Sequence, residues 1–172
     1  MPTTVAIIGA GPLGRWLAIA AARAGFRVFL EDVMPANLHH AQEVLRHHRA
    51  DGVELVSTIE DAVREADLAI DCVPDELESK LEIFCLLDRM SPPRTVLATP
   101  STRLSIADLA ACTYRASKCI AIVAEASSLT GDAAREVLLH KTSKTSAETE
   151  ELVRTFWEKI GFIARVERDP AE

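Results

Sequence analysis

The chain of 172 residues, 48% hydrophobic and 26% charged, is long enough to bury the core of one globular domain. Its formal net charge of −7, with no cluster of Lys or Arg, argues against a nucleic-acid-binding surface. Neither a secretory leader nor an apolar run able to span a bilayer is visible, so we expect a cytoplasmic protein. The cysteines lack metal-ligand spacing, and we expect free thiols and no metal site: Cys72, Cys85, Cys112 and Cys119.

The first predicted elements are a strand, a glycine-rich turn and a helix. A short apolar, β-branched run predicts a buried strand over Thr4–Ile8. Residues 9–14 then fit the pattern G-x-G-x-x-G, and an Ala- and Leu-rich helix is predicted over Arg15–Ala24. Strand, turn and helix in this order are the context that the glycine pattern needs to indicate a dinucleotide site. The residues of the turn proposed to contact the dinucleotide are Gly9, Gly11, Pro12, Leu13 and Gly14.

Each glycine has a role that a side chain would obstruct. Gly9 makes the tight turn, Gly11 lets a pyrophosphate approach the backbone, and Gly14 lets the helix pack on the strand. The phosphates would lie at the helix N-terminus, where free N–H groups favour anions. A second strand, Arg27–Asp32, ends on a carboxylate at the spacing expected for binding the adenosine ribose. The alternative is a glycine-rich turn in an α/β protein that binds no nucleotide.

The middle of the chain predicts alternating helices and strands. The helix from Met34 to about Arg49 carries four histidines without the spacing of a metal site, which indicates a solvated face. Residues 57–60, Ser-Thr-Ile-Glu, fit a capping box. The other predicted elements are strand Val53–Val56, a helix to Ala66, strand Asp67–Val73, a helix from Pro74 through Leu87, strand Thr95–Thr99, helix Ile106–Ala111 capped by Ser105, and strand Cys119–Ala124.

The last part of the chain contains a less regular stretch over residues 125–144, followed by a helix and a strand. Ser146 is predicted to cap the helix, which runs to about Ile160, and Phe162–Glu167 is the final strand. Strands that alternate with helices call for right-handed crossovers and a doubly wound, mostly parallel α/β sheet. We therefore predict a single dinucleotide-binding domain over residues 1–172.

Three stretches beyond the glycine turn resemble the NAD-binding domain of the 3-hydroxyacyl-CoA dehydrogenase family. Residues 66–80 read ADLAIDCVPDELESK and resemble the family's A-D-L-V-I-E-A-V-P-E-x-L-x-x-K. Residues 97–106 resemble A-[ST]-N-T-S-S-L-x-I, and Thr145 and Ser146 lead into the last helix as in the family. The resemblance covers nearly the whole chain in the right order and implies the Rossmann NAD-binding fold.

The resemblance implies NAD as cofactor and a role for further residues along its path. Val73, Pro74 and Asp75 follow a strand end, where ligands bind in such sheets. By position, Asp75 and Lys80 match an acidic residue and a lysine near the nicotinamide. The alternative for Lys80 is a lysine on a helix surface. A carboxylate at Asp32 repels a 2′-phosphate and so favours NAD over NADP.

The chain also departs from the family pattern where the family's catalytic residues lie. The place of the histidine that acts as general base falls on Val123, and that of the catalytic asparagine on Ala126. Thr102 replaces the active-site serine and keeps a hydroxyl, whereas Pro100 replaces an asparagine. Glu136 matches the glutamate that orients the histidine only if a short insertion precedes it.

A substitute base would then be needed, and Glu125 is the best local candidate, ahead of His140 and Lys141.

Two functions remain open. The first is hydride transfer between NAD and a 3-hydroxyacyl thioester or small 3-hydroxy acid, as part of fatty acid metabolism. The second is a non-catalytic NAD(H)-binding module, or a subunit that depends on a partner.

The family continues past the last strand into a helical C-terminal domain, which we expect this chain to lack. A domain without that cover should leave apolar surface exposed, so a homodimer is predicted. The candidate contacts in the last helix and strand, for which core packing is the alternative, are Phe156, Trp157, Phe162 and Ile163.

Overall fold

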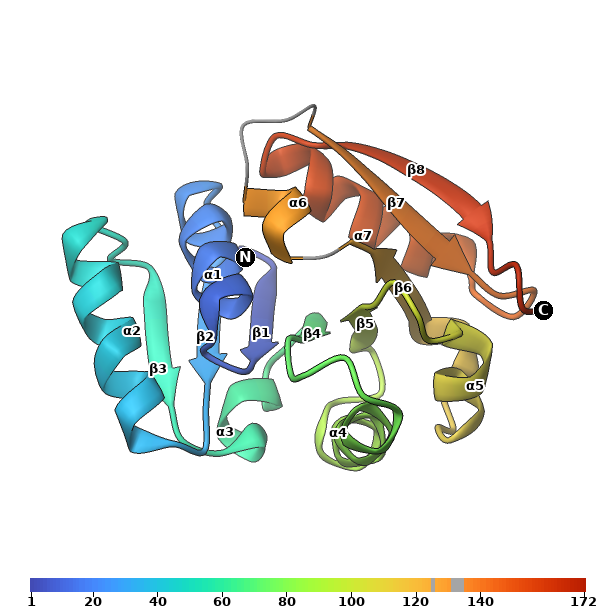
Figure 1. Cartoon of the computed structure of the whole chain (residues 1–172), viewed down its shortest axis with the longest axis horizontal. Helices are drawn as coiled ribbons and strands as arrows, with labels where there is room; N and C mark the ends of the chain where they lie inside the picture. The colour runs from blue at the N-terminus through green and yellow to red at the C-terminus, as the bar shows by residue number, and fades with distance from the viewer. Residues whose placement is uncertain (125, 131–134) are drawn as a thin grey trace.

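The described part of the chain forms one sheet in the strand order β3-β2-β1-β4-β5-β6-β7-β8 (Figure 1). The computed structural model of the protein describes residues 1–124, 126–130 and 135–172. Neighbouring strands are parallel throughout, except that β7 runs antiparallel to β6. The strands are β1 Thr4–Ile8, β2 Arg27–Glu31, β3 Val53–Val56, β4 Leu68–Asp71, β5 Val96–Pro100, β6 Cys119–Val123, β7 Glu136–Lys141 and β8 Ile163–Arg168.

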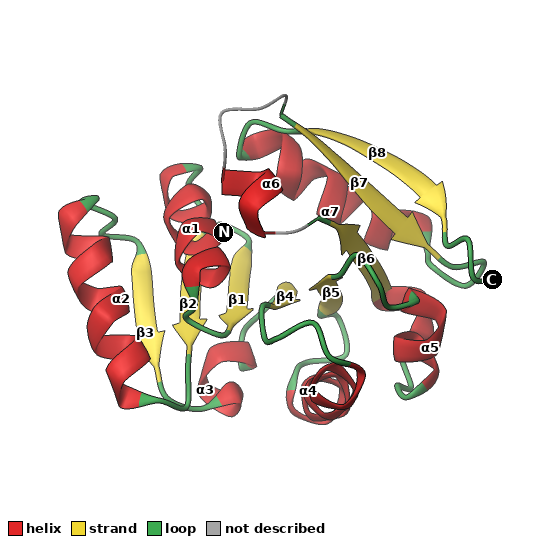
Figure 2. Cartoon of the chain, viewed as in Figure 1, coloured by secondary structure: helices red, strands yellow, loops and turns green. Residues whose placement is uncertain are grey.

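Helices cover both faces of the sheet (Figure 2). Helices α1, α2, α6 and α7 bury their apolar sides on one face, and α3, α4 and α5 on the other. This is the doubly wound, mostly parallel α/β sheet that the sequence predicts. The helices are α1 Pro12–Arg23, α2 Pro35–His47, α3 Ile59–Val63, α4 Leu77–Met90, α5 Ile106–Ala111, the short 3-10 helix Ala116–Lys118, α6 Ala126–Thr130 and α7 Ala147–Lys159.

The central strand β1 is buried on both of its faces. Val5 and Ile7 belong to the core beneath α1 and α7, whereas Ala6 and Ile8 belong to the core above α3 and α4. This explains why the strand is a continuous apolar run rather than an alternating one. Because β2 and β4 flank β1, the turn that follows Ile8 lies in the middle of the sheet's carboxyl edge.

The capping box at the start of α3 lies one residue later than predicted. Thr58, not Ser57, is the N-cap, and its Oγ1 accepts a hydrogen bond from the backbone N of Asp61 at 3.1 Å. The Thr58 hydroxyl in turn donates to Asp61 Oδ2 at 2.8 Å. Two hydroxyl residues are followed three positions later by two acids, Glu60 and Asp61, so both registers satisfy the motif equally in sequence.

The stretch predicted to be irregular contains β7 and α6. Leu139 of β7 pairs with Ile122 of β6, and the side chain of Leu139 is buried in the core that α1 and α7 cover. Helix α7 then carries the chain back so that β8 pairs in parallel with β7. Glu125 lies outside the described residues.

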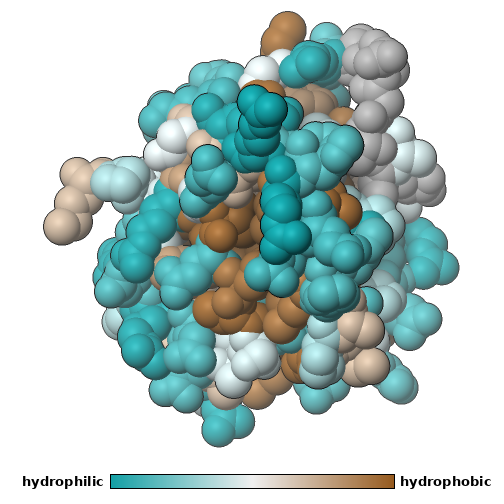
Figure 3. All heavy atoms as spheres, turned by 90° about the vertical axis from the view of Figure 1, so that its left-hand side faces the viewer, coloured by the Kyte–Doolittle hydropathy of each residue, from teal (hydrophilic) through white to brown (hydrophobic). Residues whose placement is uncertain are grey.

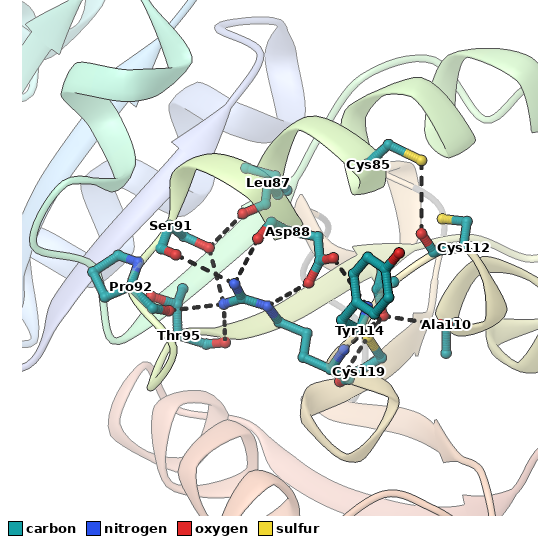
Figure 4. Close-up of polar contacts among 12 residues, drawn as sticks. Cys85, Leu87, Asp88, Ser91, Pro92, Thr95, Ala110, Cys112, Tyr114 and Cys119 are labelled. Carbon is teal, nitrogen blue, oxygen red and sulfur yellow. Dashed lines mark hydrogen bonds and ion pairs between the residues drawn. The ribbon is translucent and has the colours of Figure 1, made fainter.

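Arg115 connects three segments near the sheet's amino edge. Figure 4 shows its partners Asp88, Ser91 and Pro92. Its Nε donates to Asp88 Oδ1 at 2.7 Å, and its Nη2 donates to the carbonyl oxygen of the same residue at 2.7 Å. Nη1 donates to the hydroxyl of Ser91 at 3.0 Å and to the carbonyl oxygen of Pro92 at 2.8 Å. The Arg115 and Asp88 side chains are only 11% and 7% exposed. The guanidinium therefore holds the end of α4, the turn before β5 and the segment before β6 together.

The surface that we expected to mediate dimerisation is mostly core. Phe156, Trp157 and Phe162 are buried against α1 and the sheet, and Ile163 alone of these four candidates is exposed. Ordinary core packing is thus the correct alternative for three of them. Apolar residues gather instead on the face that carries α2 and β3 (Figure 3). Half-buried Val53 of β3 packs against a small core cluster that includes Leu45 of α2. No helix in the described ranges is long and apolar enough to cross a membrane.

Candidate functional site

The glycine turn has the close backbone contacts that its pattern predicts. Gly9 adopts φ +102°, a conformation that favours glycine, and donates its N–H to the carbonyl oxygen of Glu31 at 2.8 Å. A Cβ on Gly14 would lie 1.8 Å from the carbonyl oxygen of Gly9, so only glycine lets α1 approach the turn. A Cβ on Gly11, by contrast, would meet no atom of the described residues within 4 Å. The space beside Gly11 is therefore open to a ligand, which fits the predicted approach of a pyrophosphate.

The N-terminus of α1 opens onto the same space. Gly11 is the N-cap residue, Pro12 occupies the first turn, and no side chain caps the helix. The first turn contains no acidic residue. The backbone N–H groups of this turn and the positive end of the helix dipole are consequently available to an anion.

Asp32 lies beside the glycine turn at the end of β2 and is 9% exposed. Its Oδ2 accepts hydrogen bonds from the backbone N of Ala10 at 2.9 Å and from Asn37 Nδ2 at 3.1 Å. Its Oδ1 accepts one from the backbone N of Met34 at 2.8 Å. Each carboxylate oxygen can accept about two hydrogen bonds, so Oδ1 keeps capacity for a ribose hydroxyl. The first turn of α2 thus orients the carboxylate, a contribution from Asn37 that sequence reasoning missed.

A cavity of about 560 Å³ lies at the carboxyl edge of the sheet. It brings together six of the predicted site residues: Gly11, Pro12, Leu13, Val73, Asp75 and Thr102. A larger cavity, of about 890 Å³, lies at the opposite edge, where β1 and β5 begin at Thr4 and Val96 and where Asp67 precedes β4. We place the site in the smaller one because ligands of open α/β sheets bind outside the carboxyl ends of the strands.

Asp75 occupies the mouth of this cavity. Its Oδ2 accepts a hydrogen bond from the backbone N of Thr102 at 3.3 Å and lies 4.0 Å from Arg103 Nε. Its Oδ1 is buried and has no hydrogen-bond partner within the described part of the chain. An acceptor in this position is costly unless a ligand donates to it. Pro74 precedes Asp75 and is exposed at the same loop.

Lys80 does not lie on a helix surface, so that alternative is wrong. Its side chain is 1% exposed, and Nζ lies 3.5 Å from Asp71 Oδ2 and 3.4 Å from the Asp71 carbonyl oxygen. Asp71 also accepts hydrogen bonds from the Thr99 hydroxyl and the backbone N of Val73. Burial raises the pKa of the Asp71 carboxyl, while Lys80 opposes that effect. Lys80 therefore does not line the cavity itself. It contacts Asp71 at the end of β4, directly before the lining residues Cys72 and Val73.

Glu31 is a second buried carboxyl on this face of the sheet. Glu31 and Asp71 both pair with Ile8, from opposite sides, so the two acids flank β1 in one row. Glu31 is 2% exposed, and its Oε1 has no partner among the described residues. Burial, reinforced by the neighbouring Asp32 charge, raises its pKa to about 7. The sequence suggested no role for this residue.

Two of the three candidates for a substitute base lie away from the cavity. His140 pairs with Ala121, toward the start of β6, whereas Val123 ends that strand. Lys141 forms an ion pair with Glu150 of α7 at 2.6 Å. Neither lines the cavity. Glu125 follows β6 in sequence and stays a prediction.

Sequence reasoning also missed Arg103. Its side chain lines the cavity next to Thr102 and donates through Nη2 to the carbonyl oxygen of Asp75. An arginine in a loop gives no periodic signal, so nothing in the pattern of the sequence distinguishes it from a solvated surface residue.

Comparison with known proteins agrees with this geometry. Residues 4–164 match the family described as 3-hydroxyacyl-CoA dehydrogenase, NAD binding domain. A probable 3-hydroxybutyryl-CoA dehydrogenase of Bacillus subtilis is 32% identical over 133 residues, which are 67% of this chain and 46% of that protein. The 3-hydroxyadipyl-CoA dehydrogenase of Escherichia coli is 32% identical over 125 residues, which are 63% of this chain and 26% of that protein.

Solved structures show the same fold. A diketoreductase superposes with a TM-score of 0.86 at 25% identity, covering 98% of this chain and 65% of its own. The (S)-3-hydroxybutyryl-CoA dehydrogenase of Ralstonia eutropha superposes with a TM-score of 0.86 at 20% identity, covering 98% of this chain and 64% of its own. The chain spans less than half the length of the curated relatives that it matches. From the match over residues 4–164 and the glycine turn that it includes, this chain belongs to the 3-hydroxyacyl-CoA dehydrogenase family, as its NAD-binding domain.

Proposed function

We propose that the chain binds NAD and NADH in the cavity at the sheet's carboxyl edge. We further propose that it supports hydride transfer at a carbon bearing a hydroxyl group. The observation that carries the proposal is the open space at Gly11, between the free N-terminus of α1 and the Asp32 carboxylate. The substrate class, a 3-hydroxyacyl thioester or small 3-hydroxy acid, is supported by the relatives' names, several of which are 3-hydroxyacyl-CoA dehydrogenases.

Each proposed contact follows from the geometry. The diphosphate would accept hydrogen bonds from the backbone N–H groups of Gly11 and Leu13, and Pro12, which has no N–H, would make van der Waals contact only. Gly9 and Gly14 would shape the turn. Asp32 would bind the adenosine ribose through Oδ1. Val73, Pro74 and Asp75 would line the path toward the nicotinamide, and the partnerless Oδ1 of Asp75 would accept a donor there.

The coenzyme supplies the hydride acceptor, and the protein positions the reacting carbon against it. Thr102 lines the cavity and would donate its hydroxyl hydrogen bond to the substrate oxygen. The proton of the substrate hydroxyl needs an acceptor, and we assign that role to Glu125 on its position in the sequence. Lys80 acts as a positioning residue, because it reaches the site only through Asp71.

A second candidate function is an NAD(H)-binding module without chemistry of its own, or a subunit completed by a partner. One observation favours it. Among the described residues that line the cavity, Asp75 is the sole carboxylate, and it is already held by the Thr102 N–H and by Arg103. The relatives' greater length also leaves room for groups supplied from elsewhere.

A matched pair of glycine variants tests coenzyme binding. In Gly11→Ala the new Cβ meets no atom in the part of the chain that the structure describes, so the chain should fold normally, yet the methyl group occupies the space proposed for the diphosphate. We expect NADH affinity, measured by calorimetry, to fall about tenfold or more, which corresponds to about 1.4 kcal/mol. Gly52→Ala is the control, because its Cβ would sit in ordinary contact with Ala22 at 3.4 Å, far from the turn. Equal NADH affinity in both variants would contradict the proposed site.

Turnover separates the two functions. We expect the purified chain to reduce NAD when it is supplied with 3-hydroxybutyryl-CoA or 3-hydroxybutyrate, and Glu125→Gln to lose that activity while it keeps NADH binding. Intact NADH binding without turnover of either compound selects the non-catalytic module.

A further inference from the structure

Arg103 lies in the connection between β5 and α5, beside the hydroxyl residue that we assign to the substrate (Figure 1). Its side chain is 68% exposed at the mouth of the cavity. Arg103 and Asp75 are the two charged residues in the described lining, and Arg103 is the sole cation there. The cavity therefore presents one guanidinium group close to where a substrate would meet Thr102.

The backbone beneath Arg103 is held firmly. Ser101 is 4% exposed, and its Oγ accepts hydrogen bonds from the backbone N of Arg103 at 3.2 Å and of Leu104 at 2.9 Å. The Ser101 N–H donates to the carbonyl oxygen of Ile122 in β6 at 2.9 Å. Ser105 then caps α5, together with Asp169, whose Oδ2 accepts from the backbone N of Ala107 at 3.1 Å. The loop thus fixes where the arginine side chain starts.

Asp75 orients the guanidinium, and contacts with the described residues use only part of its N–H donors. Nη2 donates to the carbonyl oxygen of Asp75, and Nε lies 4.0 Å from Asp75 Oδ2, at the limit of an ion pair. A guanidinium carries about five N–H donors in a planar fork, so at least two remain for a ligand in the cavity. Two parallel N–H donors match a carboxylate, which they bind in bidentate fashion.

We propose that Arg103 receives a free carboxylate carried by the substrate, which makes the preferred substrate a small hydroxy or keto acid rather than a neutral ester or amide. This rests on the proposed function, because it deepens the assignment of the same cavity. Thr102 and Arg103 are adjacent in the lining, so one would bond the oxygen at the reacting carbon and the other the acid group. Arg103 is a specificity-determining residue in this scheme.

Two anions compete for Arg103 in principle, and the test must separate them. The first is the substrate carboxylate, and the second is a phosphate of the coenzyme or of coenzyme A. The probes are therefore 3-hydroxybutyrate and 3-hydroxybutyramide, which differ only in the acid group, with 3-hydroxybutyryl-CoA as a third arm. Calorimetry measures each probe on the chain alone and on its complex with NAD, and NADH is titrated separately into every variant.

In the wild-type chain we expect 3-hydroxybutyrate to bind about tenfold or more tightly than the amide. In Arg103→Gln the acid and the amide should bind about equally. Arg103→Lys should keep part of the preference for the acid, because lysine retains the positive charge but not the two parallel N–H donors of the guanidinium. Arg89→Gln removes the same charge from the exposed last turn of α4 and should leave the preference intact. NADH affinity should be the same in all four proteins.

Four results would overturn the proposal. The wild type could bind acid and amide equally or show no detectable 3-hydroxybutyrate binding, and Arg103→Gln could lose NADH affinity or lose affinity for 3-hydroxybutyryl-CoA alone. Failure of the wild type to bind NADH would instead refute the proposed function. In that case the titrations of acid and amide into the chain without NAD would still test the role of Arg103.

Discussion

Replacing Glu31 with Gln should make the chain more stable at alkaline pH. The folded state raises the pKa of this carboxyl from 4.5 to about 7, so the folded chain holds the proton more tightly than the unfolded chain. The resulting stabilisation is fully present below pH 4.5 and is lost as pH rises through 7. At about 1.4 kcal/mol per pH unit, this interval corresponds to about 3 kcal/mol of unfolding free energy. Gln is neutral at every pH, so a chain with Gln at this position does not lose that unfolding free energy as the pH rises.

The assay is urea denaturation at several pH values between 5 and 9, followed by fluorescence of the buried Trp157. We expect Glu31→Gln to gain about 2.5 kcal/mol relative to the wild type between pH 5 and pH 9, because a small part of the loss has already occurred at pH 5. Glu54→Gln is the control, because Glu54 lies on the neighbouring strand β3 but is exposed. Other titrating groups cancel in the comparison. Parallel pH profiles for the wild type and Glu31→Gln would refute the reasoning.

Two other perturbations test the architecture and the coenzyme site. Arg115→Ala leaves the buried Asp88 carboxylate without its cationic partner and should lower the unfolding free energy by about 3–5 kcal/mol, measured by urea denaturation. Arg94→Ala, which breaks an exposed ion pair, should cost less than about 1 kcal/mol in the same assay, and similar losses in the two variants would contradict the account. Asp32→Ser removes the charge that repels a 2′-phosphate, so the ratio of NADH to NADPH affinity, measured by fluorescence titration, should fall about tenfold or more. An unchanged ratio would show that Asp32 does not meet the ribose.

The central strands could be predicted because a strand that is buried on both faces has a continuous run of apolar residues in the sequence. Val5, Ala6 and Ile7 are apolar without interruption, and no other element explains such a run between turn residues. Strand β7 was not predicted because its apolar part is only three residues long and lies between the polar residues Glu136 and His140. A run that short is also compatible with a loop, and only its antiparallel pairing with β6 settles the matter.

The site was predictable where backbone geometry dictates the residue type, and not where a side chain depends on distant partners. The glycines of the turn are of the first kind, since no other residue fits at Gly14. Glu31 and Arg115 are of the second kind. Glu31 is buried because the sheet order places it in one row with Ile8 and Asp71. Most partners of Arg115 are backbone carbonyl oxygens, which every residue type has and which therefore leave no signal in the sequence.

The two glycines that flank Pro12 and Leu13 are under different constraints. Gly14 presses against a backbone carbonyl oxygen in the protein itself, whereas Gly11 borders empty space that only a bound coenzyme would fill. In a lineage that had abandoned the coenzyme, genetic drift would replace Gly11 early, while Gly14 would persist for as long as the chain folded. Substitution rates at these two positions among descendants would therefore distinguish retained binding from inheritance of the scaffold alone.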